Sequence, residues 1–404
     1  MALQRNRVRK KTIRDIDVSG KRVFVRVDYN VPLDKESGAI LDDGRIRATL
    51  PTIGYLRERG AKVILGSHVG RPSGAPDTKL SLKPVARRLA ELIGAPVRTT
   101  DCCIGADTQR AAHSLDAGEV LLLENLRFHE QEEANDPEYA KALASLAEAY
   151  VNDAFGTAHR AHASTSGIAK YLPAVAGFLM EKEIEFLSKA AINPEHPYAA
   201  IIGGAKVSSK MAVMAHLMDK VDKLLIGGGM ANTFLKAEGF SVGESLVEDG
   251  YLDQAREIMQ HAEAKGLKLL LPTDVIVAQR FEADSPARRV SVRDVPDGWR
   301  ILDVGETTID VFAHALKGCK TVVWNGPMGV IEMAPFSHGS HRLAAVVANL
   351  DGATTIIGGG ETAVVVKQIG FQGRFSHVST GGGASLEFLE GKELPGVSAL
   401  LDAD

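Results

Sequence analysis

Residues 62–71 read Lys62-Val-Ile-Leu-Gly-Ser-His-Val-Gly-Arg71, a short apolar run that ends in Gly and Ser and is followed by polar side chains. Runs of this kind, followed by a longer helical pattern, are typical of buried parallel strands joined by crossover helices. They recur along the chain, so the sequence predicts an α/β fold with parallel sheets flanked by helices. The predicted strands are Arg22–Val27, Lys62–Ser67, Val120–Glu124 and Ala149–Asp153 in the first half, and Ala199–Gly203, Lys223–Gly227, Lys268–Leu271, Thr321–Trp324, Thr354–Gly358 and His377–Ser379 in the second.

The length of 404 residues exceeds the size at which one hydrophobic core keeps growing, so two domains are expected. A candidate connector is Gly177–Asn193, where Met180, Ile184, Leu187 and Ala191 fall on one helical stripe and Asn193-Pro194 ends the helix. Periodicity alone also allows this segment to be another crossover helix of a single sheet.

Composition restricts the class of protein. A net charge of −4 gives no basic excess of the kind that duplex binders use, so no nucleic-acid partner is expected. Three cysteines, two of them adjacent at Cys102 and Cys103, form neither a disulfide framework nor a CxxC metal site, which favours a reducing compartment. No apolar run approaches the roughly 20 residues of a membrane span. We therefore expect a cytoplasmic protein without a membrane partner.

Most of the polar residues that follow the first-half strands are arginines and histidines. Ligands of open parallel sheets bind at the carboxyl ends of the strands, so these positions carry functional information. They are Asp28 and Asn30, His68 and Arg71, Arg127, and the segment His159-Arg160-Ala161-His162, with Arg45 in the loop after the first strand. Any one arginine taken alone reads as a surface residue, but four at repeated positions after strands predict a site for a small polyanion. A metal site at His159 and His162 lacks a third ligand nearby.

Glycine follows the second-half strands instead. The turns are Gly203-Gly204-Ala205-Lys206, Gly227–Gly229, Asn325-Gly326-Pro327, Gly358-Gly359-Gly360-Glu361-Thr362 and Gly381–Gly383. Glycine permits close backbone approach, and N–H groups at a helix start bind phosphate, so this half is predicted to bind a nucleotide. One such turn alone would be read as a packing device. No Walker A sequence occurs, and the G-x-G-x-x-A match at Gly358–Ala363 lacks the acidic residue that a dinucleotide site needs about 20 positions later.

These motifs resemble phosphoglycerate kinase. They occur in the order of that family from near residue 20 to the C-terminus, and each is more specific than a generic glycine motif. The matching segments are Arg26-Val-Asp-Tyr-Asn-Val-Pro32, Ser67-His-Val-Gly-Arg-Pro72, Glu124-Asn-Leu-Arg-Phe128, Asn152-Asp-Ala-Phe-Gly-Thr-Ala-His-Arg-Ala-His162, Gly203-Gly-Ala-Lys-Val207, Trp324-Asn-Gly-Pro327 and Ser379-Thr-Gly-Gly-Gly-Ala384.

The resemblance implies two substrate sites. The acid substrate, 3-phosphoglycerate or 1,3-bisphosphoglycerate, would be held by Asp28, Asn30, Arg45, His68, Arg71, Arg127 and Arg160. The nucleotide, ADP or ATP, would be held by Gly204, Lys206, Lys210, Gly228, Asn325, Glu332, Gly359, Gly360, Glu361 and Thr362, with Glu332 at the ribose. Arg45, Lys206 and Lys210 would be catalytic, and Glu361 would hold Mg²⁺ through the nucleotide.

Two positions depart from the commonest form of the family. Glu361 stands where Asp is usual, and Ser209 stands where many members have Asp before the second lysine. Glutamate still offers a hard oxygen ligand to Mg²⁺. The departures therefore bear on the metal geometry and not on the activity.

The resemblance also implies a mechanism and a domain plan. No general base is needed, because the accepting carboxylate or phosphate oxygen is already ionised at pH 7. In-line transfer would be stabilised by Arg45 and Lys206 in a cleft that closes. The expected plan is residues 1–176 as the acid-binding domain, 177–193 as a hinge helix, 194–385 as the nucleotide domain and 386–404 as a tail returning to the first domain, in a monomer. A dinucleotide-linked dehydrogenase and a non-catalytic nucleotide sensor are the alternatives.

Overall fold

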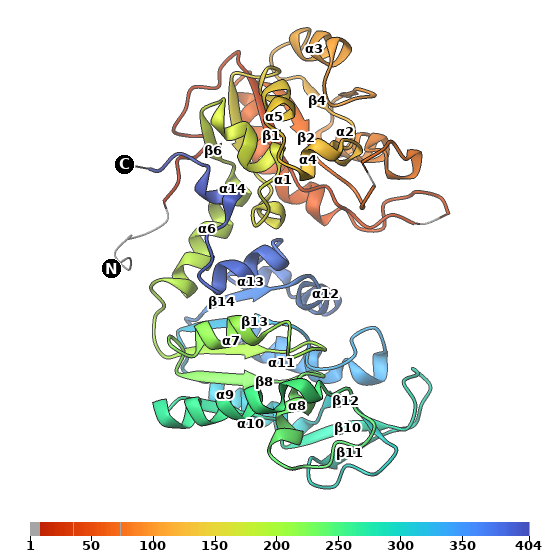
Figure 1. The fold of residues 1–404 in the computed structure, drawn as a ribbon, viewed down its shortest axis with the longest axis vertical. Coiled ribbons are helices and arrows are strands. Elements are labelled where there is room, and N and C mark those ends of the chain that lie inside the picture. Colours follow the sequence, from red (N-terminus) through yellow and green to blue (C-terminus); the bar gives the residue numbers. More distant parts are fainter. Residues whose placement is uncertain (1–8, 35, 73, 404) are drawn as a thin grey trace. The chain divides into compact units, whose positions relative to one another are not determined.

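The computed structural model describes residues 9–34, 36–72 and 74–403. The chain divides into two compact units, Met1–Glu185 with Glu393–Asp404 and Phe186–Lys392 (Figure 1). The boundary falls inside helix α6, Phe178–Ala191, which occupies most of the predicted connector. Residues 386–392 of the predicted tail belong to the second unit, and residues from Glu393 onward belong to the first.

The first unit contains a six-stranded sheet in the order β3-β4-β2-β1-β5-β6. All neighbouring strands are parallel. The strands are β1 Arg22–Arg26, β2 Lys62–Gly66, β3 Val97–Thr99, β4 Val120–Leu122, β5 Ala149–Asn152 and β6 Ala174–Ala176. The helices are α1 Gly44–Glu58, α2 Lys83–Ile93, α3 Ala106–His113, α4 Glu130–Glu133, α5 Pro137–Ala144 and α14 Pro395–Ser398, with short turns η1 Thr78–Leu80, η2 Leu126–Phe128, η3 Phe155–Thr157, η4 Ala163–Gly167 and η5 Ile168–Lys170.

The second unit repeats this architecture with a parallel sheet in the order β15-β14-β13-β7-β8-β9. Its strands are β7 Tyr198–Ile202, β8 Lys223–Ile226, β9 Lys268–Leu270, β13 Thr321–Asn325, β14 Thr354–Gly358 and β15 His377–Val378. The helices are α7 Met211–Leu217, α8 Ala231–Ala237, α9 Leu252–Lys265, α10 Glu306–Leu316, α11 His338–Ala348, α12 Gly360–Gln368 and α13 Gly383–Leu389, with turns η6 Asp249–Tyr251, η7 Ala334–Phe336 and η8 Gln372–Arg374.

The α/β prediction is confirmed, and each of the predicted apolar runs overlaps a strand. The prediction missed an antiparallel sheet in the second unit, with the order β11-β10-β12. Its strands are β10 Asp274–Ala278, β11 Ala287–Ser291 and β12 Arg300–Val304. Strand β11 is largely exposed and carries two arginines, so it lacks the buried apolar run that marks the other strands. The short strands β3 and β6 were missed as well.

Burial explains why the parallel strands are nearly continuous apolar runs. Helices cover both faces of such a sheet, so the side chains on both faces of a strand such as β7 are buried. The first unit packs its sheet against Ile46, Ile53 and Leu56 of α1, among others. The core of the second unit includes Trp324 of β13, whose indole nitrogen donates to the carbonyl of Gly326 at 2.7 Å.

The C-terminal residues lie in the first unit next to its first described residues. The amide of Lys11 donates to the carbonyl of Leu401 at 2.8 Å, and the amide of Leu401 donates to the carbonyl of Ala174 in β6 at 2.9 Å. Lys10 forms an ion pair with Asp402 at 2.7 Å. The edge strand β6 is therefore bordered by Lys11 from the N-terminal part of the chain and by Leu401 from the C-terminal part.

Candidate active site

The first-unit site is built at the carboxyl edge of neighbouring parallel strands. Strands β2 and β5 pair with β1 on either side, and their last residues lie opposite Arg26. The loops that follow these strands therefore leave the sheet at one edge. They carry Asp28 and Asn30, His68 and Arg71, and Arg160.

His68 marks the centre of this basic group. Burial lowers the pKa of its imidazole well below the usual value, and the charges of Arg26, Arg127, Arg45 and Arg160 lower it further. Four guanidinium groups thus act on one buried side chain, including three of the four arginines predicted for the site. The imidazole is neutral at pH 7, and the positive potential comes from the arginines.

Arg127 is nearly fully buried, on turn η2. Its Nη1 donates to the carbonyl of Gly70 at 3.0 Å, and its Nε lies 3.2 Å from a carboxylate oxygen of Glu133 without hydrogen-bond geometry. Its Nη2 has no hydrogen-bond partner within the described part of the chain. Burial removes water from this cation and lowers its pKa. An anion bound at Nη2 would therefore offset the free-energy cost of burying the charge.

The remaining residues of the group are held around the same loops. Asp28 accepts a hydrogen bond from Arg45 in the first turn of α1 and another from the amide of Asn30 at 3.2 Å. The side-chain oxygen of Asn30 accepts from the amide of Gly70 at 2.9 Å. The next residue after Gly70 is the exposed Arg71. The structure therefore brings six of the seven predicted acid-site residues into one connected group and leaves Arg71 exposed next to it.

The two other histidines of this region stay close to Arg160. The ring Nε2 of His159 accepts from the Nε of Arg160 at 3.2 Å. Burial lowers the pKa of His162 to about 4, with Arg26, Arg127 and Arg160 lowering it further. Within residues 9–34, 36–72 and 74–403, no group of three or more His, Cys, Asp or Glu side chains could hold a metal ion.

Three buried residues next to this site were missed by sequence reasoning. Arg26 lies within strand β1, and its Nε donates to the hydroxyl of Ser164 at 2.8 Å. That hydroxyl donates to Glu132 at 2.5 Å, and the amide of Ser164 donates to the same carboxylate at 3.0 Å. A signal existed at Arg26, because a charged residue that ends an otherwise apolar buried strand requires a buried partner.

In the second unit, Lys210 and Asn325 meet at the end of strand β13. The ammonium group of Lys210 donates to the side-chain oxygen of Asn325 at 2.5 Å. Burial lowers the pKa of Lys210, while the charges of Glu361 and Glu390 oppose that shift. Three predicted nucleotide residues therefore lie close together, and Glu390 joins them without having been predicted. The side-chain amide nitrogen of Asn325 is buried without a partner in the described chain, so it can donate to a ligand.

The glycine turns of this unit have two different structural roles. A Cβ atom at Gly228 would lie 2.6 Å from the amide nitrogen of Gly204, and one at Gly326 would lie 2.2 Å from the carbonyl oxygen of Gly203. These turns pack backbone against backbone, and both glycines have positive φ. By contrast, Gly360 at the start of α12 faces open space. Close backbone packing therefore accounts for part of this set of glycines.

The other predicted nucleotide residues differ in exposure. The Thr362 hydroxyl is buried and accepts from the amide of Gly326 at 2.7 Å. Lys206, Glu332 and Glu361 are exposed. The hydroxyl of Ser209, one of the two unusual positions, donates to the carbonyl of Lys206 at 2.8 Å. Ser209 thus helps to order the backbone between the two lysines.

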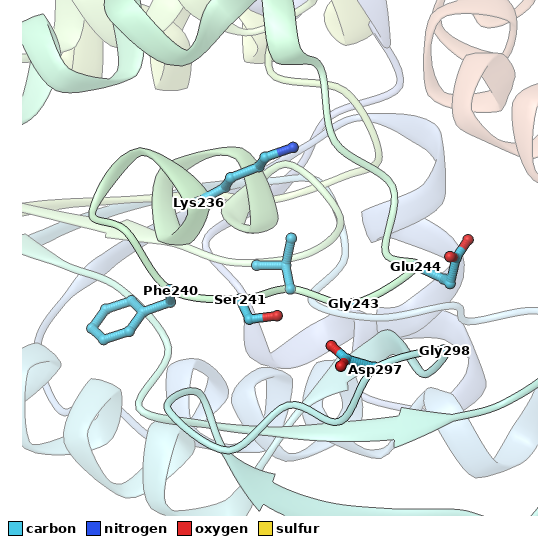
Figure 2. Close-up of a pocket in the computed structure, with 8 residues that line it drawn as sticks. Lys236, Phe240, Ser241, Gly243, Glu244, Asp297 and Gly298 are labelled. Carbon is cyan, nitrogen blue, oxygen red and sulfur yellow. The ribbon is translucent and has the colours of Figure 1, made fainter.

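A separate cavity of about 420 Å³ lies between α8, the loop that follows it at residues 240–244, and the turn at Asp297 and Gly298 (Figure 2). Its lining includes Lys236, Glu244 and Asp297, and the lysine already pairs with Asp249 at 2.7 Å. None of the predicted site residues lines this cavity. Its lining carries two carboxylates and one lysine that is already paired, so it does not resemble a polyanion site.

Comparison with known proteins identifies the family of the chain. Residues 13–392 match the family described as phosphoglycerate kinase. The chain belongs to the phosphoglycerate kinase family. The resemblance that the sequence motifs indicated is thereby confirmed over nearly the whole length.

Relatives from distant sources support this phosphoglycerate kinase assignment. The chain is 58% identical to phosphoglycerate kinase of Moorella thermoacetica, covering 97% of this chain and 99% of that one. It is 57% identical to phosphoglycerate kinase of Synechococcus elongatus, with coverage of 96% and 97%. Among solved structures, phosphoglycerate kinase from Coxiella burnetii matches with a TM-score of 0.86 and 42% identity, covering 96% of this chain and 98% of that one. The enzyme from Pyrococcus horikoshii matches with a TM-score of 0.84 and 33% identity, with the same coverage.

One general feature concerns membranes. No helix in the described ranges is long and apolar enough to span a bilayer.

Proposed function

We propose that this protein catalyses the reversible transfer of the acyl phosphoryl group of 1,3-bisphosphoglycerate to ADP, giving 3-phosphoglycerate and ATP in glycolysis. The observation that carries the proposal is the convergence of Arg45, Arg127 and Arg160 on the buried His68. Guanidinium groups suit the carboxylate and phosphate oxygens of a small polyanion. Membership of the phosphoglycerate kinase family supplies the identity of that polyanion.

The acid substrate would be held by the first unit. Asp28, Asn30, Arg45, His68, Arg71, Arg127 and Arg160 are the proposed contacts. The unpartnered Nη2 of Arg127 supports this role, because a buried donor without an acceptor gains free energy when an anion binds.

The nucleotide would be held by the second unit. Lys210, Asn325 and Glu361 lie close together, and Gly360 leaves the N–H groups at the start of α12 open to a phosphate. Lys206, Thr362, Gly359 and Glu332 complete the proposed contacts. For Gly204 and Gly228 we propose a supporting role, which keeps the neighbouring turns closely packed.

Mg²⁺ is the proposed cofactor, brought by the nucleotide. Such sites use one or two carboxylates together with phosphate oxygens, so a preformed cluster of acidic ligands is not required. The exposed carboxylate of Glu361, next to the proposed phosphate position, fits this coordination. The cation would neutralise charge on the nucleotide phosphates.

The chemistry needs positioning and positive charge more than proton transfer. Both acceptors are ionised at neutral pH, and the neutral His68 and His162 are not required as bases. Arg45 and Lys206 would stabilise the charge on the transferring group. Because different units would hold the two substrates, the units would close on each other before transfer and exclude water.

The three free thiols fit the proposed cytoplasmic location.

A coupled assay of ATP formation from 1,3-bisphosphoglycerate and MgADP tests the proposal. Arg71→Ala should raise the KM for the acid substrate by about tenfold through loss of a charge-assisted hydrogen bond, with little change in the KM for the nucleotide. Arg110→Ala, at another exposed arginine of the same unit, is the matched control. A purified protein that binds nucleotide but forms no ATP would favour the sensor alternative.

A further inference from the structure

A chain of buried polar groups links Glu132 to His68. Glu132 of α4 accepts from the hydroxyl of Ser164 at 2.5 Å, and this hydroxyl accepts from the Nε of Arg26 at 2.8 Å. The Nη2 of Arg26 lies 3.3 Å from the Nδ1 of His68. All four residues are at least nine-tenths buried, and Glu132, Ser164 and Arg26 are at most 1% exposed. None of these three was assigned to a substrate above.

The direction of each hydrogen bond in this chain follows from the chemistry of the groups. A guanidinium group has only donors, so the Nδ1 of His68 must accept from Arg26. The single hydroxyl hydrogen of Ser164 then goes to Glu132, because Arg26 cannot accept it. A neutral imidazole that accepts at Nδ1 carries its proton on Nε2. His68 is neutral because burial and the surrounding arginines hold its pKa well below the usual value.

This arrangement has a consequence for ligand binding. A neutral imidazole protonated on Nε2 presents a hydrogen-bond donor to an anion, whereas the other tautomer would present a lone pair and repel it. Arg26 also has a second fixed contact, because its Nη1 donates to the carbonyl of Val27. The hydroxyl of Ser164 accepts from the Nε of the same guanidinium group. The segment that carries Ser164 is itself fixed, since Tyr150 donates to the carbonyl of Ser164 at 2.9 Å.

We propose that Ser164 and Glu132 are positioning residues of the acid-substrate site, which act through Arg26 to hold His68 in the tautomer that donates from Nε2 to the anionic substrate. This inference rests on the proposed function, because it takes 3-phosphoglycerate as the anion. Burial raises the pKa of the Glu132 carboxyl group, and the charge of Arg26 opposes that shift, so the two buried groups stabilise each other's charged forms.

Ser164→Ala tests the chain of contacts in two ways. Nitrogen-15 spectra of histidine-labelled protein without ligand distinguish protonated from unprotonated ring nitrogens, and the His68 signals are assigned from their loss in His68→Ala. We expect the wild type to carry the proton on Nε2 and Ser164→Ala to populate both tautomers. Calorimetry with 3-phosphoglycerate should show affinity reduced by about tenfold, which is the effect of weakening one hydrogen bond to a charged group. The matched control is Ser166→Ala on the same turn, whose hydroxyl bonds to the carbonyl of His162 instead.

A double-mutant cycle separates positioning from general damage. If Ser164 acts through His68, Ser164→Ala should cost no further affinity in the His68→Ala background. An equal loss in both backgrounds, or an unchanged His68 tautomer in Ser164→Ala, would overturn the inference. If Ser164→Ala does not fold, Glu132→Gln serves in the same cycle. Both oxygens of Glu132 accept hydrogen bonds from Ser164, one from its amide and one from its hydroxyl, and the glutamine side chain replaces one of these acceptors with an NH₂ donor.

Failure of the proposed function would look different. A wild type that does not bind 3-phosphoglycerate would refute that function, whereas the spectra of the ligand-free protein test the tautomer separately.

Discussion

At the scale of single residues, two lysines four positions apart occupy different environments. Lys210 is partly buried, is hydrogen-bonded to Asn325 and has a lowered pKa, so its position is fixed before any ligand binds. Lys206 is exposed in the loop before α7. An exposed, flexible cation can follow a moving phosphoryl group, whereas a fixed one holds its charge at one place beside the nucleotide.

We predict that Lys206→Ala lowers kcat by about 100-fold or more while changing either KM by less than about threefold. The reason is that its charge would be used in the transition state and not in the ground state. Steady-state kinetics with both substrates is the measurement. Lys236→Ala is the control, at an exposed lysine of the same unit that pairs with Asp249. A normal kcat with only a raised KM would remove Lys206 from the catalytic role.

The second residue-scale prediction concerns Glu361. Glu361→Ala should shift the dependence of activity on Mg²⁺ to several-fold higher concentration, because a hard oxygen ligand is lost. Glu361→Asp should remain active, since it keeps a carboxylate. Glu257→Ala, at an exposed position of α9, is the control. If the Mg²⁺ titration of Glu361→Ala overlays that of the wild type, the metal role is wrong.

At the scale of elements, the start of α6 depends on one buried carboxyl group. Asp153, which follows β5, accepts from the amides of Leu179 and Met180 at 2.9 and 3.2 Å. The amide of Phe178 donates to the hydroxyl of Thr52 in α1 at 2.9 Å. The beginning of this helix is thus tied to β5 and α1, which both lead into the acid site.

Asp153 should make stability depend on pH. Burial raises its pKa from 3.8 to about 7, although hydrogen bonds from Thr52, Met180 and Leu179 oppose the shift. Between these values the folded state binds more protons than the unfolded state, so the stability that this group contributes is largest below about pH 4 and falls as pH rises toward 7. Relative to Asp153→Asn, the wild type should lose about 2 kcal/mol in free energy of unfolding between about pH 5 and pH 7.

Urea denaturation of both proteins across this range checks the sign. Asp101→Asn is the control, because the ion pair with Lys83 lowers the pKa of that exposed carboxyl group. The effect of this substitution on the free energy of unfolding should therefore not change between about pH 5 and pH 7. A difference between wild type and Asp153→Asn that does not change with pH would show that the carboxyl group keeps one charge state throughout.

At the scale of the whole molecule, the two compact units carry different chemistry. Arginines gather in the first unit, and glycine turns with Lys210 and Asn325 gather in the second. Neither unit contains both proposed substrate sites. The proposed mechanism therefore includes a conformational change that each substrate would favour only in part.

We predict that 3-phosphoglycerate and a non-reacting Mg-nucleotide analogue together reduce the radius of gyration more than either ligand alone. Each ligand would contact the opposite unit only in the closed state, so the closed population rises most when both are bound. Small-angle scattering measures this change, with the single-ligand samples as controls. A radius that stays at the ligand-free value in the ternary mixture would contradict closure, even if phosphoryl transfer is demonstrated.

The sequence by itself determined the α/β class, the predicted strands of the parallel sheets, the family and the residue types at both sites. These features depend on local patterns, since a buried parallel strand is a continuous apolar run and the residue after it lies at the ligand-binding edge. The exposed strand β11 has no such pattern, because its pairing with β10 depends on contacts that form only in the folded chain. Only the tertiary structure showed that Gly228 and Gly326 are needed for packing, and that Arg26 depends on Ser164 and Glu132. These partners are far apart along the chain, and burial in a common core is what makes each polar group require the other.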